Sequence, residues 1–244
     1  GKNYVFAAIA PAVTGASYSY ENENYTLGEI TIDATPEKQI DYMTADVKKD
    51  VQSTSGTVSF TFNHIASKID FNFQPKIADA GAWQSDVKID IKKITLSGVH
   101  TKNSYNSSIW STSNTPGNFV KEGASGGVYG TTTYENSTVT PLEDQFSWLV
   151  VPQNDTNASD RKLTITFDLY TKDADGKYNV KNLENKEASV DVATNWEANN
   201  HYTYTVYIGT DVLGTDPYIT FDVAKVEGWD TEGNSSDLDV STSN

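Results

Sequence analysis

Residues 123–127 give the most direct match to a catalytic motif, because Gly-Ala-Ser-Gly-Gly fits the G-x-S-x-G pattern of serine hydrolases. That mechanism needs a strand before the serine and a helix after it, which together present the nucleophile on a sharp turn. Here Pro116 and Gly117 lie shortly before the motif, and residues 128–130 after it show no helical pattern. We therefore interpret the segment as a glycine loop and expect no catalytic role for Ser125.

The three histidines do not have the spacing of a metal site. His64, His100 and His201 are far apart, and none lies in an H-x-H or H-E-x-x-H arrangement. The chain has no cysteine, which excludes thiolate zinc sites, iron–sulfur clusters, thiol nucleophiles and disulfides. His64 ends a predicted strand in register with its buried face, so we expect a buried structural side chain. The sequence therefore predicts no metal site and no cofactor.

The acidic residues offer one calcium-like segment, at 173–176. Its Asp-Ala-Asp-Gly sequence lacks the spacing of an EF-hand loop. Asp-Gly between two strand-like runs is typical of a hairpin, so we predict a turn here. A carboxylate pair for glycoside hydrolysis stays open as an alternative, because any two of the 33 Asp and Glu residues could converge. The single arginine, Arg161, argues against an enzyme for phosphate or carboxylate substrates.

Aromatic side chains are the remaining candidates for ligand contact. Trp110 lies in a segment rich in Ser, Thr and Asn, which favours an exposed ring that could stack on a sugar. Tyr105 and Tyr129 lie in or near the same segment and complete a possible stacking platform. Trp148 alternates with Phe146 and Val150, so we assign it to the core.

Charge and composition narrow the class of protein further. The formal net charge of −15 over 244 residues disfavours nucleic acids and anionic lipid surfaces as partners. No apolar run is long enough for a membrane-spanning helix, and the start at Gly1-Lys2-Asn3 shows no signal peptide. We interpret this start as that of a trimmed chain. Hydrophobic residues make up only 37% but aromatic residues reach 11%, so we expect a folded protein with a thin core and a polar surface.

Alternation of apolar and polar residues is the dominant pattern, as in Leu163, Ile165 and Phe167, which are separated by threonines. Such a period of two is typical of strands with one buried face. The strongest runs are at 58–62, 69–73, 163–169, 202–208 and 219–223, and weaker ones are at 4–10, 29–34, 146–151 and 188–192. Joined by Gly, Asn, Asp and Pro turns, these runs predict an all-β protein built of antiparallel sandwiches.

Some segments depart from this pattern. Within 87–96 the apolar positions change from odd to even numbers at Lys92-Lys93, which predicts a β-bulge. Short helical turns are expected near 41–47 and 64–67. Residues 103–140, rich in Ser, Thr, Asn and Gly, are either a long loop or weak edge strands. We place a domain boundary near residue 100, which divides the chain into domains at 1–100 and 101–244.

An ordered set of short motifs resembles the fimbrillin-like (Mfa-like) proteins of Bacteroidetes. The clearest is Val58–Phe71, a strand ending in Phe-x-His followed by a small-residue turn, Lys-Ile and a second strand. The other segments that resemble the family's motifs follow in the family's order and are Phe6–Pro11, Asp41–Ala45, Leu149–Gln153, Trp196–Val206 and Val226–Trp229.

The resemblance implies two tandem Greek-key sandwiches of transthyretin-like type, and a role as a pilus subunit or adhesin at the outer membrane. Family members usually carry a longer segment before the first motif, including a lipoprotein signal, so an incomplete amino-terminal domain is expected here. In related fimbrial proteins a protease removes a first strand and a neighbouring subunit's strand fills the groove, which is β-strand addition. The family's cleavage arginine has no counterpart, because no arginine precedes Arg161.

These considerations give a first hypothesis, a non-catalytic surface subunit that binds other fimbrial subunits through strand edges. The edge residues expected to serve are Tyr4, Phe6, Ala8, Ile219, Phe221 and Val223. The acidic tail 230–244 is either a frayed terminus or a donated strand. The second hypothesis is a surface carbohydrate-binding module that uses Trp110, Tyr105 and Tyr129, and the third is an acidic hydrolase.

Overall fold

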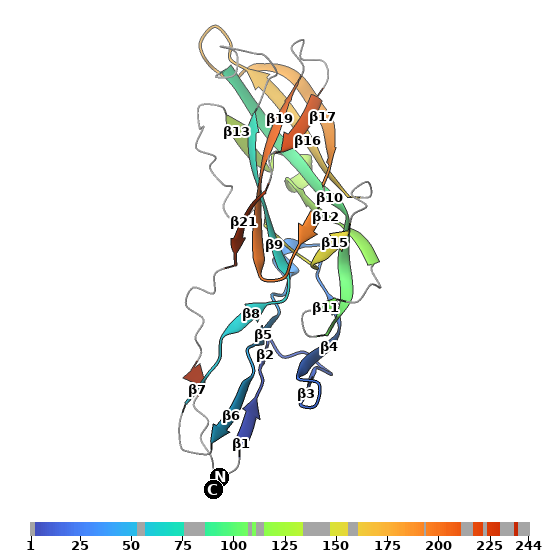
Figure 1. Ribbon diagram of the computed structural model, residues 1–244. Helices are drawn as coiled ribbons and strands as arrows, with labels where there is room; N and C mark the ends of the chain where they lie inside the picture. Colours follow the sequence, from blue (N-terminus) through green and yellow to red (C-terminus); the bar gives the residue numbers. More distant parts are fainter. Residues whose placement is uncertain are drawn as a thin grey trace.

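The computed structural model shows an elongated protein made almost entirely of strands (Figure 1). It describes residues 3–52, 57–75, 86–106, 109–110, 115–133, 147–155, 161–192, 194–210, 217–221, 224–229 and 237–238. The 3₁₀ turns that lie wholly within these ranges are η1 (Pro36–Lys38) and η3 (Ala124–Gly126). The all-β prediction is confirmed, and no described helix is long and apolar enough to cross a bilayer.

The larger sheet is organised around one long strand, β10 (Val87–Asn106). On one side β10 pairs first with β16 and then with β4, and on the other side with β13, β12 and β11. Strands β17 and β3 complete the order β17-β16-β10-β4-β3. Their bounds are β3 (Ser17–Ser19), β4 (Asn24–Thr31), β11 (Ile109–Trp110), β12 (Thr115–Glu122), β13 (Gly130–Thr133), β16 (Lys162–Thr171) and β17 (Val180–Asp191).

The second sheet has the order β14-β9-β19-β20, and β21 also pairs with β19. The β9–β19 pair is parallel, which departs from the antiparallel expectation. Parallel neighbours need a long crossover connection, and strands of the other sheet lie between β9 and β19 in the sequence. The bounds are β9 (Ser67–Pro75), β14 (Trp148–Val150), β19 (Asn200–Thr210), β20 (Pro217–Phe221) and β21 (Lys225–Gly228).

The two sheets enclose the main hydrophobic core. Alternate residues of β10 and β16, such as Ile89, Ile91 and Ile165, lie with Phe71 and Val206 of the second sheet in one buried cluster. Trp148 is fully buried in this cluster, as predicted from its alternation. Alternation along each strand therefore places one face in the sandwich and leaves the other in water.

The amino-terminal strands form a narrower extension at one end of the molecule, where β1 and β6 lie (Figure 1). There β2 pairs with β5 and β5 with β8, while β1 pairs with β6 and β7 with the tail segment β22. A small separate cluster around Ala45, Phe60 and Phe62 packs this extension. The bounds here, with the remaining β15–β18 pair, are β1 (Asn3–Phe6), β2 (Ile9–Ala10), β5 (Met43–Ala45), β6 (Lys48–Gln52), β7 (Val58–Ser59), β8 (Phe62–His64), β15 (Gln153–Asp155), β18 (Thr194–Trp196) and β22 (Asp237–Leu238).

Local predictions have mixed outcomes. The register shifts between Ile91 and Lys93, which confirms the bulge, and Asp175-Gly176 lies in the predicted β16–β17 hairpin. The helical turns expected near 41–47 and 64–67 are wrong, because Met43–Ala45 is a strand paired on both sides and residues 64–67 contain no helical turn. The described part of 103–140 forms strands rather than one loop. Residue 100 lies inside β10, and the division into two domains stays a prediction.

A buried ion network crosses the outer face of the larger sheet. The Asp168 carboxylate on β16 is 2% exposed, and it lies 3.0 Å from the Lys92 ammonium and 3.3 Å from that of Lys181. It also accepts a hydrogen bond from the Asn185 N–H at 2.7 Å. Burial alone would raise the pKa of Asp168, but the Asn185 amide and the two lysines hold this pKa below its usual 3.8.

Replacing Asp168 by Asn should lower the free energy of unfolding by about 2 kcal/mol at pH 7, because two lysines and a buried amide lose a charged acceptor. The folded-state pKa is depressed, so this difference is present above the ordinary carboxyl pKa and is lost as pH falls through the folded value. Urea denaturation at pH 7 and at pH 3 measures it. Asp191→Asn, which removes an exposed partner of Lys162, is the control and should change stability by less than about 1 kcal/mol. Equal effects of the two variants at pH 7 would contradict the prediction.

Candidate functional site

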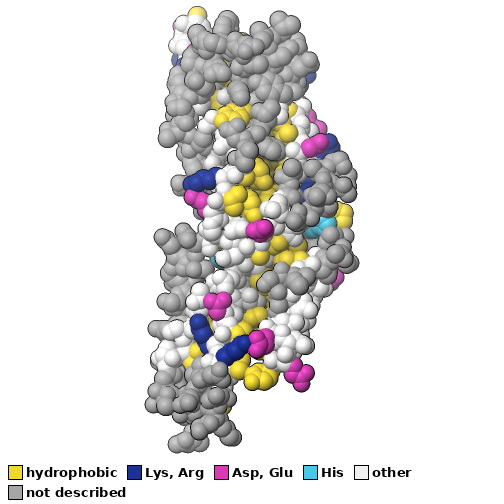
Figure 2. All heavy atoms as spheres, in the orientation of Figure 1, with side chains coloured by type: hydrophobic (Ala, Val, Ile, Leu, Met, Phe, Trp, Pro, Cys, Tyr) yellow, Lys and Arg dark blue, Asp and Glu magenta, His cyan; other side chains and the backbone are white. Residues whose placement is uncertain are grey.

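The margins of the sheets are the candidate functional surface, because an edge strand presents unpaired backbone groups to other chains. The margin at β17 is poorly suited to pairing. It carries exposed Lys181, Glu184 and Lys186, and two register shifts interrupt its ladder with β16. Charges and bulges of this kind discourage further strands. On the face shown in Figure 2, acidic and basic side chains likewise lie scattered beside a broken band of hydrophobic ones.

The margin at β14 is covered by a single side chain. The Gln39 amide accepts a hydrogen bond from the Leu149 N–H at 2.7 Å and donates one to the Leu149 carbonyl at 3.1 Å. It also donates to the Asp33 carbonyl at 3.0 Å, which ties it to the loop before β5. Gln39 therefore takes the place that a neighbouring strand would occupy beside Leu149.

The margin at β20 and β21 contains the carboxy-terminal residues predicted for assembly. Ile219 pairs with Ile208 of β19 and is buried in the main core, and Phe221 pairs with Val206. Val223 lies outside the described residues. In the described part, β20 and β21 both pair with β19, and no strand pairs with them on the other side.

The margin at β1 and β2 contains the amino-terminal residues predicted for assembly. Tyr4 is 43% exposed, while Phe6 and Ala8 are half-buried. Residues 3–10 carry no charge. Among the described residues, β1 pairs only with β6 and β2 only with β5, so one side of each strand has no partner strand.

A tyrosine hydroxyl fixes the position of this margin. The Tyr25 hydroxyl of β4 donates a hydrogen bond to the Ala45 carbonyl at 2.6 Å and accepts one from the Ala8 N–H at 3.3 Å. The Ala45 N–H donates directly to the Ala8 carbonyl at 2.9 Å. The Tyr25 hydroxyl thus bridges the backbone of Ala8, which lies between β1 and β2, and that of Ala45 in β5. Burial raises the pKa of Tyr25, so the hydroxyl keeps its proton.

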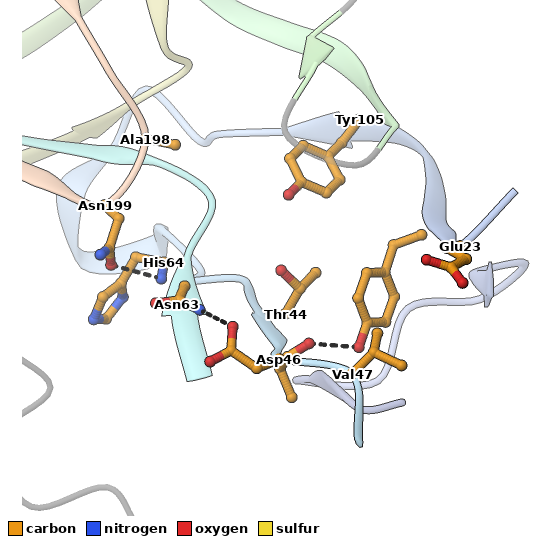
Figure 3. Close-up of a pocket in the computed structure, with 11 residues that line it drawn as sticks. Glu23, Thr44, Asp46, Val47, Asn63, His64, Tyr105, Ala198 and Asn199 are labelled. Atoms are coloured by element: carbon orange, nitrogen blue, oxygen red, sulfur yellow. Dashed lines mark hydrogen bonds between the residues drawn. The ribbon is translucent and has the colours of Figure 1, made fainter. Parts of the chain in front are cut away.

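A cavity of about 540 Å³ lies beside this hydroxyl, where the narrow extension meets the main sandwich (Figure 3). We call it the waist cavity. Its lining is Glu23, Tyr25, Thr44, Ala45, Asp46, Val47, Asn63, His64, Tyr105, Ala198 and Asn199. Tyr105 is therefore the predicted ligand residue that the structure places in a cavity.

The other two rings of the predicted stacking platform lie differently. Trp110 is half-buried and contacts Tyr105 edge-on, with 5.2 Å between ring centroids. Tyr129 lies toward the other end of β10, where its N–H donates to the Ile91 carbonyl. Burial and the charge of Glu37 raise the pKa of Tyr129 to about 12. The structure brings Tyr105 and Trp110 together and separates Tyr129 from them.

The residues considered for chemistry have structural surroundings. Ser125 is exposed in the η3 turn, and strand β13 rather than a helix follows it. His64 is buried, as predicted, with its ring stacked on Trp229 at 3.8 Å and its Nδ1 2.7 Å from Asp41 Oδ2. No group of three acidic or histidine side chains in the described ranges is arranged to hold a metal ion.

Comparison with known proteins identifies the family. A fimbrillin-like family model matches residues 1–229, so the chain belongs to the fimbrillin-like family. No curated protein matches the chain.

Solved structures share the fold. A candidate cell adhesion protein from Bacteroides uniformis has a TM-score of 0.56 and 21% identity, over 93% of this chain and 73% of that one. A fimbrial protein from Bacteroides vulgatus has a TM-score of 0.54 and 19% identity, over 92% and 77%. A candidate cell adhesion protein from Bacteroides ovatus has a TM-score of 0.51 and 19% identity, over 94% and 69%.

The sequence did not single out Tyr25 and Gln39 at the margins, nor Thr44, Asp46, Asn63 and Asn199 in the waist cavity. Tyr25 alternates with Leu27 and so indicates only a strand residue. Gln39 lies in a segment without any alternation, and its contact with Leu149 joins distant parts of the chain. Only the alternation of Tyr25 gave any signal, and that signal concerned burial rather than function.

Replacing Gln39 by Ala should destabilise the protein by about 1–2 kcal/mol, because the Leu149 N–H and carbonyl lose their partners. The opened margin should also increase self-association, which sedimentation velocity over a concentration series measures. Gln74→Ala, on β9 away from this margin, is the matched control. An unchanged monomer fraction and unchanged stability in Gln39→Ala would contradict the covering role.

Replacing Tyr25 by Phe should cost about 1–2 kcal/mol, since the Ala8 N–H and the Ala45 carbonyl lose the bridging hydroxyl. Hydrogen exchange of the Ala8 amide should accelerate more than that of β16 amides, because the loss is local. Tyr18→Phe removes a hydroxyl from the ring that contacts Tyr25 and serves as the control. Equal protection of Ala8 in both variants would rule out the bridging role.

Proposed function

We propose that this protein is a non-catalytic fimbrial subunit or adhesin of the bacterial cell surface, and that it joins other fimbrial subunits by β-strand addition. Membership of the fimbrillin-like family supports the class of protein and its surface location. Proteins of the same fold are described as fimbrial or cell adhesion proteins, which agrees with this class.

The uncharged margin at β1 and β2 is the observation that carries the mechanism. Ala8 directs its N–H and carbonyl toward Tyr25 and Ala45. Since successive residues alternate in direction, the N–H and carbonyl of the next residue, Ile9 of β2, point outward. An added strand would bond to these groups and place alternate side chains against Phe6 and its neighbours. By contrast, the margins at β14 and β17 are covered or charged.

The absence of cysteine makes a direct test available, because one introduced thiol reports one position. Tyr4→Cys places a thiol at the proposed margin, and Tyr20→Cys places one on the exposed β3–β4 turn as a control. In cells that make this protein, a membrane-impermeant cross-linker that carries one maleimide and one photoreactive group is attached to the introduced thiol. On illumination it should join position 4, but not position 20, to another fimbrial subunit. Adding Val5→Lys to the Tyr4→Cys variant should abolish the product, because a charged residue opposes edge pairing.

The cross-linking result tests the surface location of the protein separately from its assembly through β1 and β2. If the thiol at position 20 is labelled but the thiol at position 4 forms no cross-link, the surface location stands and assembly through β1 and β2 is rejected. Failure of both thiols to react on intact cells, with reaction after lysis, would reject the surface location itself.

A further inference from the structure

The waist cavity contains the hydroxyl groups of two buried residues, and neither hydroxyl has a partner in the described part of the chain. Thr44 is 8% exposed and Tyr105 is 5% exposed, and both hydroxyls point into the cavity (Figure 3). Because the two residues are held in place by burial while their hydroxyl oxygens face the cavity, these hydroxyls can each donate or accept a hydrogen bond with a molecule in the cavity.

Three polar side chains at the rim, those of Asp46, Asn63 and Asn199, are held by hydrogen bonds that use only some of their polar atoms. The Asn63 amide donates to Asp46 Oδ1 at 3.0 Å, which leaves the Asn63 side-chain carbonyl and the second Asp46 oxygen. The Asn199 side-chain carbonyl accepts from the His64 N–H at 3.0 Å, which leaves the Asn199 amide hydrogens. The cavity therefore offers fixed donors and fixed acceptors together.

The charges of the lining indicate the class of ligand. No lysine or arginine is among the described lining residues, so a phosphate or carboxylate would meet no countercharge. A metal ion is also disfavoured, because Glu23 already pairs with Lys49 and no group of three acidic or histidine side chains among the described residues is arranged to hold one. A neutral molecule with several hydroxyls satisfies both the donors and the acceptors.

We infer that the waist cavity binds a neutral sugar residue, with Thr44, Tyr105, Asp46, Asn63 and Asn199 contacting its hydroxyls. The volume of about 540 Å³ lies within the range of roughly 300–1,000 Å³ that is typical of small-molecule sites. Tyr105 acts through its hydroxyl, because its ring is buried against Trp110. The inference does not rest on strand addition, since none of these five residues lies in β1 or β2.

Saturation-transfer NMR on the full chain tests it with glucose, galactose, mannose, fucose and N-acetylglucosamine at millimolar concentration. At least one of these sugars should bind. Tyr105→Phe and Thr44→Val should each weaken that binding about fivefold, because each removes one hydrogen bond worth about 1 kcal/mol. Tyr20→Phe removes an exposed hydroxyl of the same kind outside the cavity and should leave the affinity unchanged. Thermal unfolding of each variant establishes that it is folded.

Every other outcome overturns the inference. If none of the five sugars binds, the cavity holds water only. If a sugar binds all variants equally, it binds elsewhere. Glucosamine and glucuronate are measured in the same way as charged comparisons. If either binds in the cavity more tightly than every neutral sugar, the ligand is charged and the assignment to neutral sugars is wrong.

Discussion

Every backbone N–H and carbonyl group that leaves water must find a partner, and this requirement governs the whole molecule. Within the sheets, neighbouring strands supply the partners, and β10 alone pairs with five other strands. At the margins the requirement is met in different ways. A glutamine amide replaces a strand beside β14, while charges and bulges interrupt β17. The backbone groups that remain available to another chain are therefore those at margins that no side chain covers and that no charge or bulge interrupts.

The junction between the extension and the sandwich depends on the same requirement. Tyr25 reaches from β4 into the ladder of the first strand. The Asn199 side chain accepts from the His64 N–H, while the Asn199 backbone carbonyl accepts from the Trp229 N–H. Both residues connect segments that are distant in sequence. The side chain of Tyr25 also lines the waist cavity, so the geometry of the first strand and that of the cavity share one residue.

The sequence predicts most of the strands because alternation is a local property. The buried face can be read directly from the alternating apolar residues of Leu163–Leu169 and Tyr202–Ile208. The bulge near Lys92 is visible because the apolar positions change from odd to even numbers there. Pairing is not local, so the parallel contact of β9 with β19 could not be predicted. Met43–Ala45 was expected to turn as a helix, but strands on both sides hold it extended. Tyr105 was expected to present its ring, whereas Trp110 covers the ring and leaves the hydroxyl facing the cavity.

The length of β10 also has a mechanical consequence. This strand runs along the long axis of the molecule, bonded to β4 near the extension and to β16 in the main sandwich (Figure 1). A tensile force applied along that axis would load its hydrogen bonds in shear, so that many must break together rather than one after another. The same strand that shapes the core would therefore give a surface protein resistance to pulling by flow or by an attached cell.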